Sequence, residues 1–214
     1  MDEEITIIDQ KTRNEKIKIF FIENKKLLIS ISTFLILILT SFYSYEIYKN
    51  RHIERLSNKY NNAVIDYEYG EKSKTILSMK EVIEDKNTTY SPLALYFLID
   101  NKLIKNKAEI NDLFDIIIKK TPLENEIKNL IIYKKALYNA EISSENELLD
   151  TLSPLINSKS VWKSHALYLI AEYFYSKKEE QKAKEFFKQI LGTENANQDI
   201  IKKAQKRLNR DLSE

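Results

Sequence analysis

One uncharged run constrains this chain more than any other feature of its sequence. Residues Leu27 to Tyr45 form 19 consecutive positions without a charged side chain. A helix of that length crosses a hydrocarbon core about 30 Å thick. Most helices in water-soluble proteins keep one polar face, so they rarely carry so long an uncharged stretch. The run therefore predicts a single transmembrane helix over residues 27–45, with Leu27, Phe34, Leu39 and Tyr45 in the membrane anchor.

The flanks of this run predict its orientation. Lys25 and Lys26 precede it, and Tyr43, Tyr45 and Tyr48 cluster at its end. Lysines mark the cytoplasmic side of many spans, and tyrosines concentrate at membrane interfaces. We expect residues 1–26 to form a cytoplasmic tail and residues 46–214 to lie on the other side of the membrane.

Two further readings concern the start of the chain. A cleaved signal peptide is disfavoured, because about two dozen mostly polar residues precede the run and no small-residue cleavage site follows it. The apolar cluster between Ile17 and Ile22 allows two interpretations. It either lies in the membrane interface or extends the transmembrane helix by a frayed turn.

The rest of the composition favours helices. The chain has two glycines and three prolines, too few for the many turns of an all-β fold. Its 34 basic and 32 acidic residues nearly cancel, which argues against a nucleic-acid-binding protein with a large basic face. With no cysteine, the chain has no disulfide and no thiolate nucleophile or metal ligand.

Residues 46–214 show helical periodicity that is divided by end signals. Gly70 is placed to end a first helix, Ser91 with Pro92 to start another, and Thr121 with Glu124 to form a capping box. Ser144 with Glu147 repeats the capping-box pattern, Pro154 bends or ends the helix that it opens, and Trp162 begins the next long helix. Long helices are expected to begin near residues 53, 92, 122, 161 and 198. A spacing in the mid-thirties is typical of tetratricopeptide hairpins.

The best-formed repeat runs from Ser164 to Asn197. Its large, small and aromatic positions let two helices pack closely, although Ile190 and Asn195 depart from the tetratricopeptide pattern. These repeat-packing residues are Leu167, Ile170, Ala171, Phe174, Ala183 and Phe187. We predict an all-α fold in which a single N-terminal transmembrane helix precedes an α-solenoid. The solenoid comprises about four degenerate tetratricopeptide-like hairpins and a terminal capping helix.

Residue types that carry catalysis are scarce. Two histidines, His52 and His165, lie far apart, and two glycines cannot build a phosphate-binding loop. We read His52 as an interfacial or solvated residue and His165 as a partly buried packing residue. The sequence predicts no enzyme activity, no cofactor or metal, and no small-molecule substrate.

Aromatic residues are the candidates for binding a partner protein. Tryptophan and tyrosine dominate the energetics of many interfaces, which makes Tyr96, Trp162 and Tyr168 the candidate partner-binding residues. The alternative interpretation places most of the 13 tyrosines in the core or along a groove.

The chain as a whole resembles a family of tetratricopeptide-like inner-membrane proteins related to the ancillary subunit of the bacterial protein-conducting channel, the translocon. The shared features are the charged tail, the single span, its tyrosine-rich exit and a C-terminal stretch, VWKSHALYLIAEYFYSKKEEQKAKEFFKQIL. The resemblance implies an inner-membrane anchor with a cytoplasmic N-terminus and a periplasmic repeat domain. It also implies association with secretion-channel subunits, exported chains or periplasmic folding factors, including chaperones.

A second hypothesis is a structural or division-site membrane scaffold. In this hypothesis the helix from Glu46 to Tyr69 continues the span and oligomerises as a short coiled coil. The apolar stripe that permits this pairing is Ile53, Leu56, Tyr60, Ala63 and Tyr67, although it offers fewer than four clean heptads.

Overall fold

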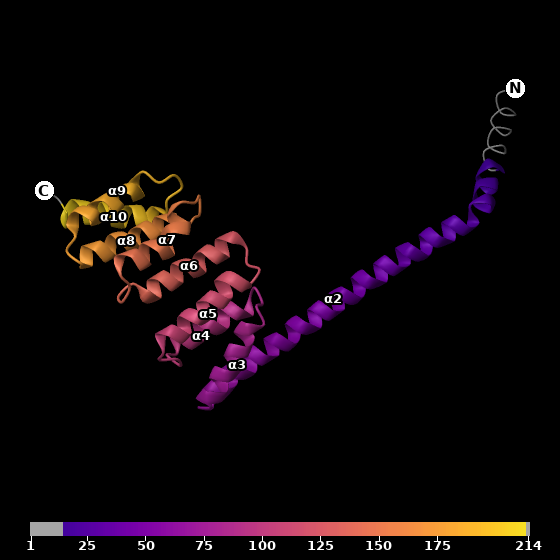
Figure 1. The fold of residues 1–214 in the computed structure, drawn as a ribbon, viewed down its shortest axis with the longest axis horizontal. Helices are drawn as coiled ribbons and strands as arrows, with labels where there is room; N and C mark the ends of the chain where they lie inside the picture. Colours follow the sequence, from indigo (N-terminus) through magenta and orange to yellow (C-terminus); the bar gives the residue numbers. More distant parts are fainter. Residues whose placement is uncertain (1–14, 213–214) are drawn as a thin grey trace, which may run out of the picture. The chain divides into compact units, whose positions relative to one another are not determined.

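The computed structural model describes residues 15–212, so most of the charged tail, residues 1–14, lies outside the described residues. Every regular element in the described part is a helix and none is a strand, which confirms the all-α prediction. The chain divides into two compact units, Met1–Arg55 and Leu56–Glu214. Figure 1 shows the helices of both units, which are taken separately below.

The first unit contains the helix that is long and apolar enough to cross a membrane. Residues 15–23 are helical, and α2 follows as a 44-residue helix, Lys25–Glu68, whose part up to Arg55 belongs to this unit. Within the described residues, α2 is the one helix long and apolar enough to cross a membrane, and no residue of its apolar window is buried. Its two threonines need no outside partner, because Thr33 and Thr40 donate hydrogen bonds to the carbonyls of Ile29 and Ile36 at 2.9 Å.

The second unit is a series of short helices that begins with the end of α2. Their bounds are α3 Lys72–Glu84, α4 Tyr90–Asp100, α5 Lys107–Lys120, α6 Asn125–Asn139, α7 Glu145–Ile156, α8 Lys163–Ser176, α9 Glu180–Leu191 and α10 Gln198–Arg210. From α3 onward each helix packs against the next along the chain. Three contacts skip one helix, joining α3 to α5, α6 to α8 and α8 to α10. Figure 1 shows this order from magenta α3 to yellow α10.

Two apolar clusters form the core of the second unit. The first gathers side chains from the end of α2 to α6, including the fully buried Leu95, Leu98 and Phe114. The second gathers α6 to α10 around Phe174 and Phe187. All six residues that the sequence pattern selects for repeat packing are buried in the second cluster: Leu167, Ile170, Ala171, Phe174, Ala183 and Phe187.

The same turn motif ends three of the helices. After α2, the backbone N–H of Gly70 donates to Tyr67 and that of Glu71 to Asp66. This pair of bonds is the Schellman motif, in which one residue adopts a left-handed conformation. Gly70 does so with φ of 85°, as its role at the helix end predicts. The motif recurs after α4 at Lys102 (φ 51°) and after α8 at Lys178 (φ 63°).

The helix-start predictions have mixed outcomes. The Ser144 capping box is confirmed, since Ser144 and Glu147 exchange both of its hydrogen bonds. Ser91 does not cap α4, because its hydroxyl donates to the carbonyl of Val82 at 2.9 Å. Asn87 instead accepts the N–H groups of Thr89 and Tyr90.

The predicted capping box at Thr121 is also wrong. Thr121 has extended backbone and follows the last residue of α5, and α6 begins only at Asn125. The hydroxyl of Thr121 is buried without a hydrogen-bond partner. The carboxylate of Glu124 likewise caps nothing, so the four residues between the helices serve as a linker.

Candidate partner-binding surface

The last helix, α10, separates its apolar and basic side chains. Asn197 caps it by accepting the N–H groups of Asp199 and Ile200 at 3.0 and 3.2 Å. Ile200 and Ala204 are buried against α8 and α9. The lysines and Arg210 are exposed and Arg207 is half-buried, as expected for a two-faced surface helix.

These basic residues line a shallow cavity with α8. The cavity has a volume of about 290 Å³ and is bordered by Tyr168, Lys203, Lys206, Arg207 and Arg210. One aromatic ring and four cations thus share a surface, which we call the α8/α10 basic face. Such a surface attracts carboxylates and excludes cationic partners.

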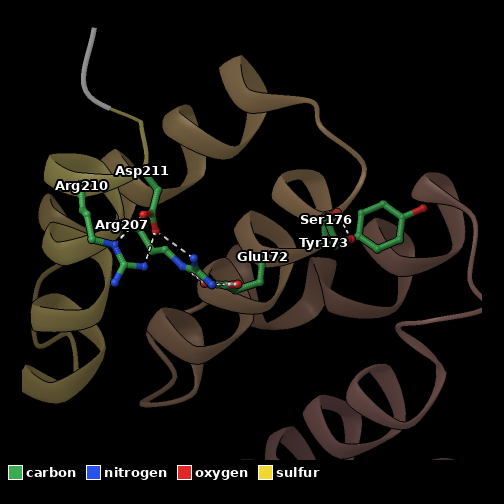
Figure 2. Close-up of polar contacts among 6 residues, drawn as sticks. All are labelled: Glu172, Tyr173, Ser176, Arg207, Arg210 and Asp211. Carbon is green, nitrogen blue, oxygen red and sulfur yellow. Dashed lines mark hydrogen bonds and ion pairs between the residues drawn. The ribbon is translucent and has the colours of Figure 1, made fainter.

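Two of the four cations are held by carboxylates of the chain itself (Figure 2). The guanidinium of Arg207 donates two hydrogen bonds of 2.8 Å to the carboxylate of Glu172 on α8 and one of 2.9 Å to Asp211. Arg210 donates to both oxygens of Asp211. The hydrogen bonds from Arg210 and Arg207 hold the pKa of Asp211 well below its usual range. Arg207 also lies over the ring of Tyr175, 4.7 Å from its centroid.

The other two cations lack such partners. Among residues 15–212, the side chains of Lys203 and Lys206 form no ion pair or hydrogen bond, and both are exposed. The net positive charge of the α8/α10 basic face therefore comes from these lysines. The paired arginine, Arg207, instead fixes α10 against α8.

Beside this face, Trp162 lies in an aromatic cluster. Its ring stacks on Tyr133 with centroids 5.8 Å apart and tilts against His165 at 5.1 Å. Burial, with a smaller contribution from the charge of Lys203, lowers the pKa of His165, and its Nδ1 is buried without a hydrogen-bond partner. His165 thus occupies the part-buried packing position that its sequence surroundings predict.

The structure does not bring the three aromatic candidates together. Trp162 and Tyr168 pack at the edge of the second cluster, whereas Tyr96 packs against the first. The Tyr96 hydroxyl is buried without a hydrogen-bond partner. Burial, with a smaller contribution from Asp100, raises the pKa of Tyr96 to about 12. The Lys134 ammonium lies 4.9 Å from the centroid of its ring.

Sequence reasoning missed the charged part of this surface. Glu172 and Arg207 are 35 residues apart, and no local pattern links them. The available signal was α10 itself, where five cations fall within thirteen residues. That density was visible in the sequence as KKAQKR.

A larger cleft lies nearby, with a volume of about 740 Å³, between the segment that leads into α8 (residues 158–163) and the end of α9 with the turn after it (residues 189–195). Its lining is mixed and includes the apolar Val161 and Leu167 beside serine, lysine and amide side chains. Ser160 at its edge donates a 2.8 Å hydrogen bond to Glu126 on α6. Across the described residues, no group of three or more histidine and carboxylate side chains is placed to hold a metal ion.

Comparison with known proteins yields no relative on which to test this surface. No protein-family model, no curated protein and no solved structure matches the chain.

Proposed function

We propose that this protein is a membrane-anchored module that binds other proteins through a stack of degenerate tetratricopeptide-like hairpins. The observation that carries the proposal is the joining of one apolar span to serially packed helix pairs that end in the α8/α10 basic face. A stack of helix pairs forms an extended surface suited to a helix or an extended segment of a partner.

The regularity of the helices supports the repeat interpretation. The helices that begin at Tyr90, Asn125, Lys163 and Gln198 start 35, 38 and 35 residues apart. The Schellman turns after α4 and α8 occupy equivalent places, each between the two helices of a pair. Contacts from α6 to α8 and from α8 to α10 are those expected when the first helices of successive pairs line one side of a solenoid.

The chemistry of the α8/α10 basic face favours an acidic partner segment. Lys203 and Lys206 supply charge that no carboxylate of the described residues neutralises, and Tyr168 lines the same cavity. The resemblance to translocon-associated proteins extends the proposal to secretion-channel subunits, exported chains and periplasmic folding factors as the partners. In this arrangement the N-terminus is cytoplasmic, and residues 46–214 are periplasmic beside the inner membrane.

Site-specific photocrosslinking in living cells tests the proposal. A photoreactive residue replaces Lys206 in the full chain, and a matched probe replaces Lys188, an exposed lysine of α9 that does not line the cavity. We expect position 206 to crosslink a secretion-channel subunit, an exported chain or a folding factor, identified by mass spectrometry. Equal crosslinking from both positions, or none from position 206, would contradict the proposed face.

The proposed orientation has its own test. The chain has no cysteine, so Lys188→Cys provides a single thiol. A membrane-impermeant maleimide applied to cells with a permeabilised outer membrane should label this thiol without lysis of the inner membrane. Labelling that requires lysis would reverse the orientation.

The scaffold alternative must account for contacts that the apolar stripe of α2 already makes. Leu56 and Ala63 are buried in the first cluster. The rings of Tyr60 and Tyr67 both contact Phe97, at 6.4 and 5.3 Å between centroids. A coiled-coil partner would have to compete with these contacts, which favours the protein-binding proposal over the scaffold.

A further inference from the structure

A cationic cluster lies on α2 just beyond the apolar run. Tyr48, Arg51, His52 and Arg55 line one cavity of about 260 Å³. Their spacing of three, four and seven residues places them on one helical face, which we call the exit face. All four belong to the first unit, and this face takes no part in the proposed protein-binding surface.

The exit face contains cations without carboxylates. On a helix with 3.6 residues per turn, Glu46 and Glu54 fall more than about 100° from the centre of this face. Among residues 15–212, neither Arg51 nor Arg55 forms an ion pair with a carboxylate. Both guanidinium groups are exposed and keep donors for an external anion.

His52 is oriented by its neighbours. Its ring stacks on that of Tyr48 with an interplanar angle of 17°, and its Nδ1 lies 3.0 Å from Nη2 of Arg55. Because a guanidinium only donates, Nδ1 is the acceptor of this hydrogen bond. The face therefore combines two guanidinium groups and a phenol hydroxyl, which can donate to phosphate oxygens, with the oriented imidazole beside them.

The position of this face selects the source of the anion. At 1.5 Å per residue, Tyr48 lies roughly 4.5 Å and Arg51 roughly 9 Å along the axis beyond Tyr45. The polar headgroup layer on each side of the hydrocarbon core is about 5–8 Å thick, and an arginine side chain can reach back into it. Tyr48 and Arg51 therefore lie near the depth of the lipid phosphates, and Arg55, roughly 15 Å beyond Tyr45 along the axis, reaches them by extending its side chain back toward the membrane.

We propose that the exit face binds the phosphate of an anionic phospholipid in the leaflet where α2 leaves the membrane. Arg51 and Arg55 bind the phosphate oxygens, the latter while it orients His52. Tyr48 covers the imidazole and lies in the interface. The bound lipid fixes the depth of the span, independently of any protein partner.

Histidine NMR of the full chain in phosphatidylcholine nanodiscs tests this proposal. The chain has two histidines, so His52 reports on the exit face and His165 is an internal reference. Raising the phosphatidylglycerol fraction should shift the His52 ring resonances saturably and leave those of His165 unchanged. The absence of a saturable His52 shift, or an equal shift of both histidines, would overturn the proposal.

Matched variants separate a built site from general attraction to charge. R51Q/R55Q removes two positive charges at the exit face, and K25Q/K26Q removes two at the other end of the run. At about 1 kcal/mol for each basic residue near an anionic surface, the first variant should weaken the His52 response roughly 30-fold. The second should leave it unchanged. Equal weakening by both variants would refute a specific site.

Inorganic phosphate distinguishes a lipid from a free anion. Added to phosphatidylcholine nanodiscs at the concentration that phosphatidylglycerol reaches, it should leave the His52 resonances in place. A saturable shift with inorganic phosphate would overturn the lipid assignment. Loss of the photocrosslinks at position 206 would leave this result untouched, because the two surfaces share no residue.

Discussion

Residues 27–45 of α2 and the short helix α4 have similar side chains but different surroundings. Both are apolar on most sides, yet the span has no buried residue in its apolar window, whereas Ala94, Leu95 and Leu98 of α4 are completely buried. The difference is length. Neighbouring helices α3 and α5 can cover the seven apolar residues LALYFLI, but 19 uncharged residues match the thickness of a bilayer. Apolar composition is common to both helices, and only the length of the α2 run is sufficient to cross a bilayer.

The largest expected effect comes from placing a charge in the helix that protein surrounds. Leu95→Arg removes a fully buried leucine and leaves an uncompensated cation in the first cluster. The combined cost is about 5 kcal/mol or more, comparable with the whole stability of many domains. In detergent, circular dichroism should show loss of helix and urea unfolding should lose its cooperative transition. The variant should still fractionate with membranes, and a normal unfolding curve would contradict the assigned core.

A leucine-to-arginine substitution in the apolar run of α2 should have a smaller effect. It should change membrane association and leave unfolding of the second unit unchanged. Leu37→Arg places a cation near the middle of the apolar run, where insertion of arginine costs about 2.5–3.5 kcal/mol. We expect a larger fraction of the chain to be extracted from membranes by alkaline carbonate. The urea midpoint of the second unit in detergent should stay at the wild-type value. A lowered midpoint in Leu37→Arg would contradict the interpretation that lipid surrounds the apolar run of α2 while protein surrounds α4.

The smallest expected effect concerns His165, a titratable residue that is half-buried on α8. Because burial lowers the pKa of His165, the unfolded chain binds more protons than the folded chain between that pKa and about 6.5. Unfolding free energy should therefore fall as the pH drops from 7.5 to 5.5. His165→Phe should reduce this dependence, measured by urea unfolding, whereas the matched variant His52→Gln should retain it. An unchanged slope in His165→Phe would show that another group causes the loss.

The sequence predicts the elements of this fold better than their ends. Runs such as Leu167, Ile170 and Phe174 identify a helix, because burial on one side repeats every three or four residues. The predicted helix caps at Ser91 and Thr121 were wrong because a hydroxyl next to a proline is equally compatible with a cap, a linker or a tertiary hydrogen bond. Only the neighbouring helix decides among these, as when the carbonyl of Val82 accepts the hydroxyl of Ser91.

The candidate surface was less predictable for a similar reason. Tyr168 and Trp162 could be selected as aromatic residues, but their part-buried positions depend on α6, α9 and α10. The bidentate pair of Glu172 and Arg207 joins helices two elements apart. No periodicity within one helix encodes such a pair, so a single sequence shows the charges without their partners.

Several helices are followed by a lysine in the left-handed conformation, and these lysines affect the stability of the fold. Lys86, Lys102 and Lys178 occupy a conformation that costs a residue with a side chain about 1–2 kcal/mol and glycine little. Each lysine instead places a cation beside the carbonyl ends of a helix, which offsets part of that cost. The folded state is therefore less stable at these three turns than it would be with glycine. Substituting glycine at these positions should raise the free energy of unfolding without altering the core, the apolar run of α2 or either proposed binding face.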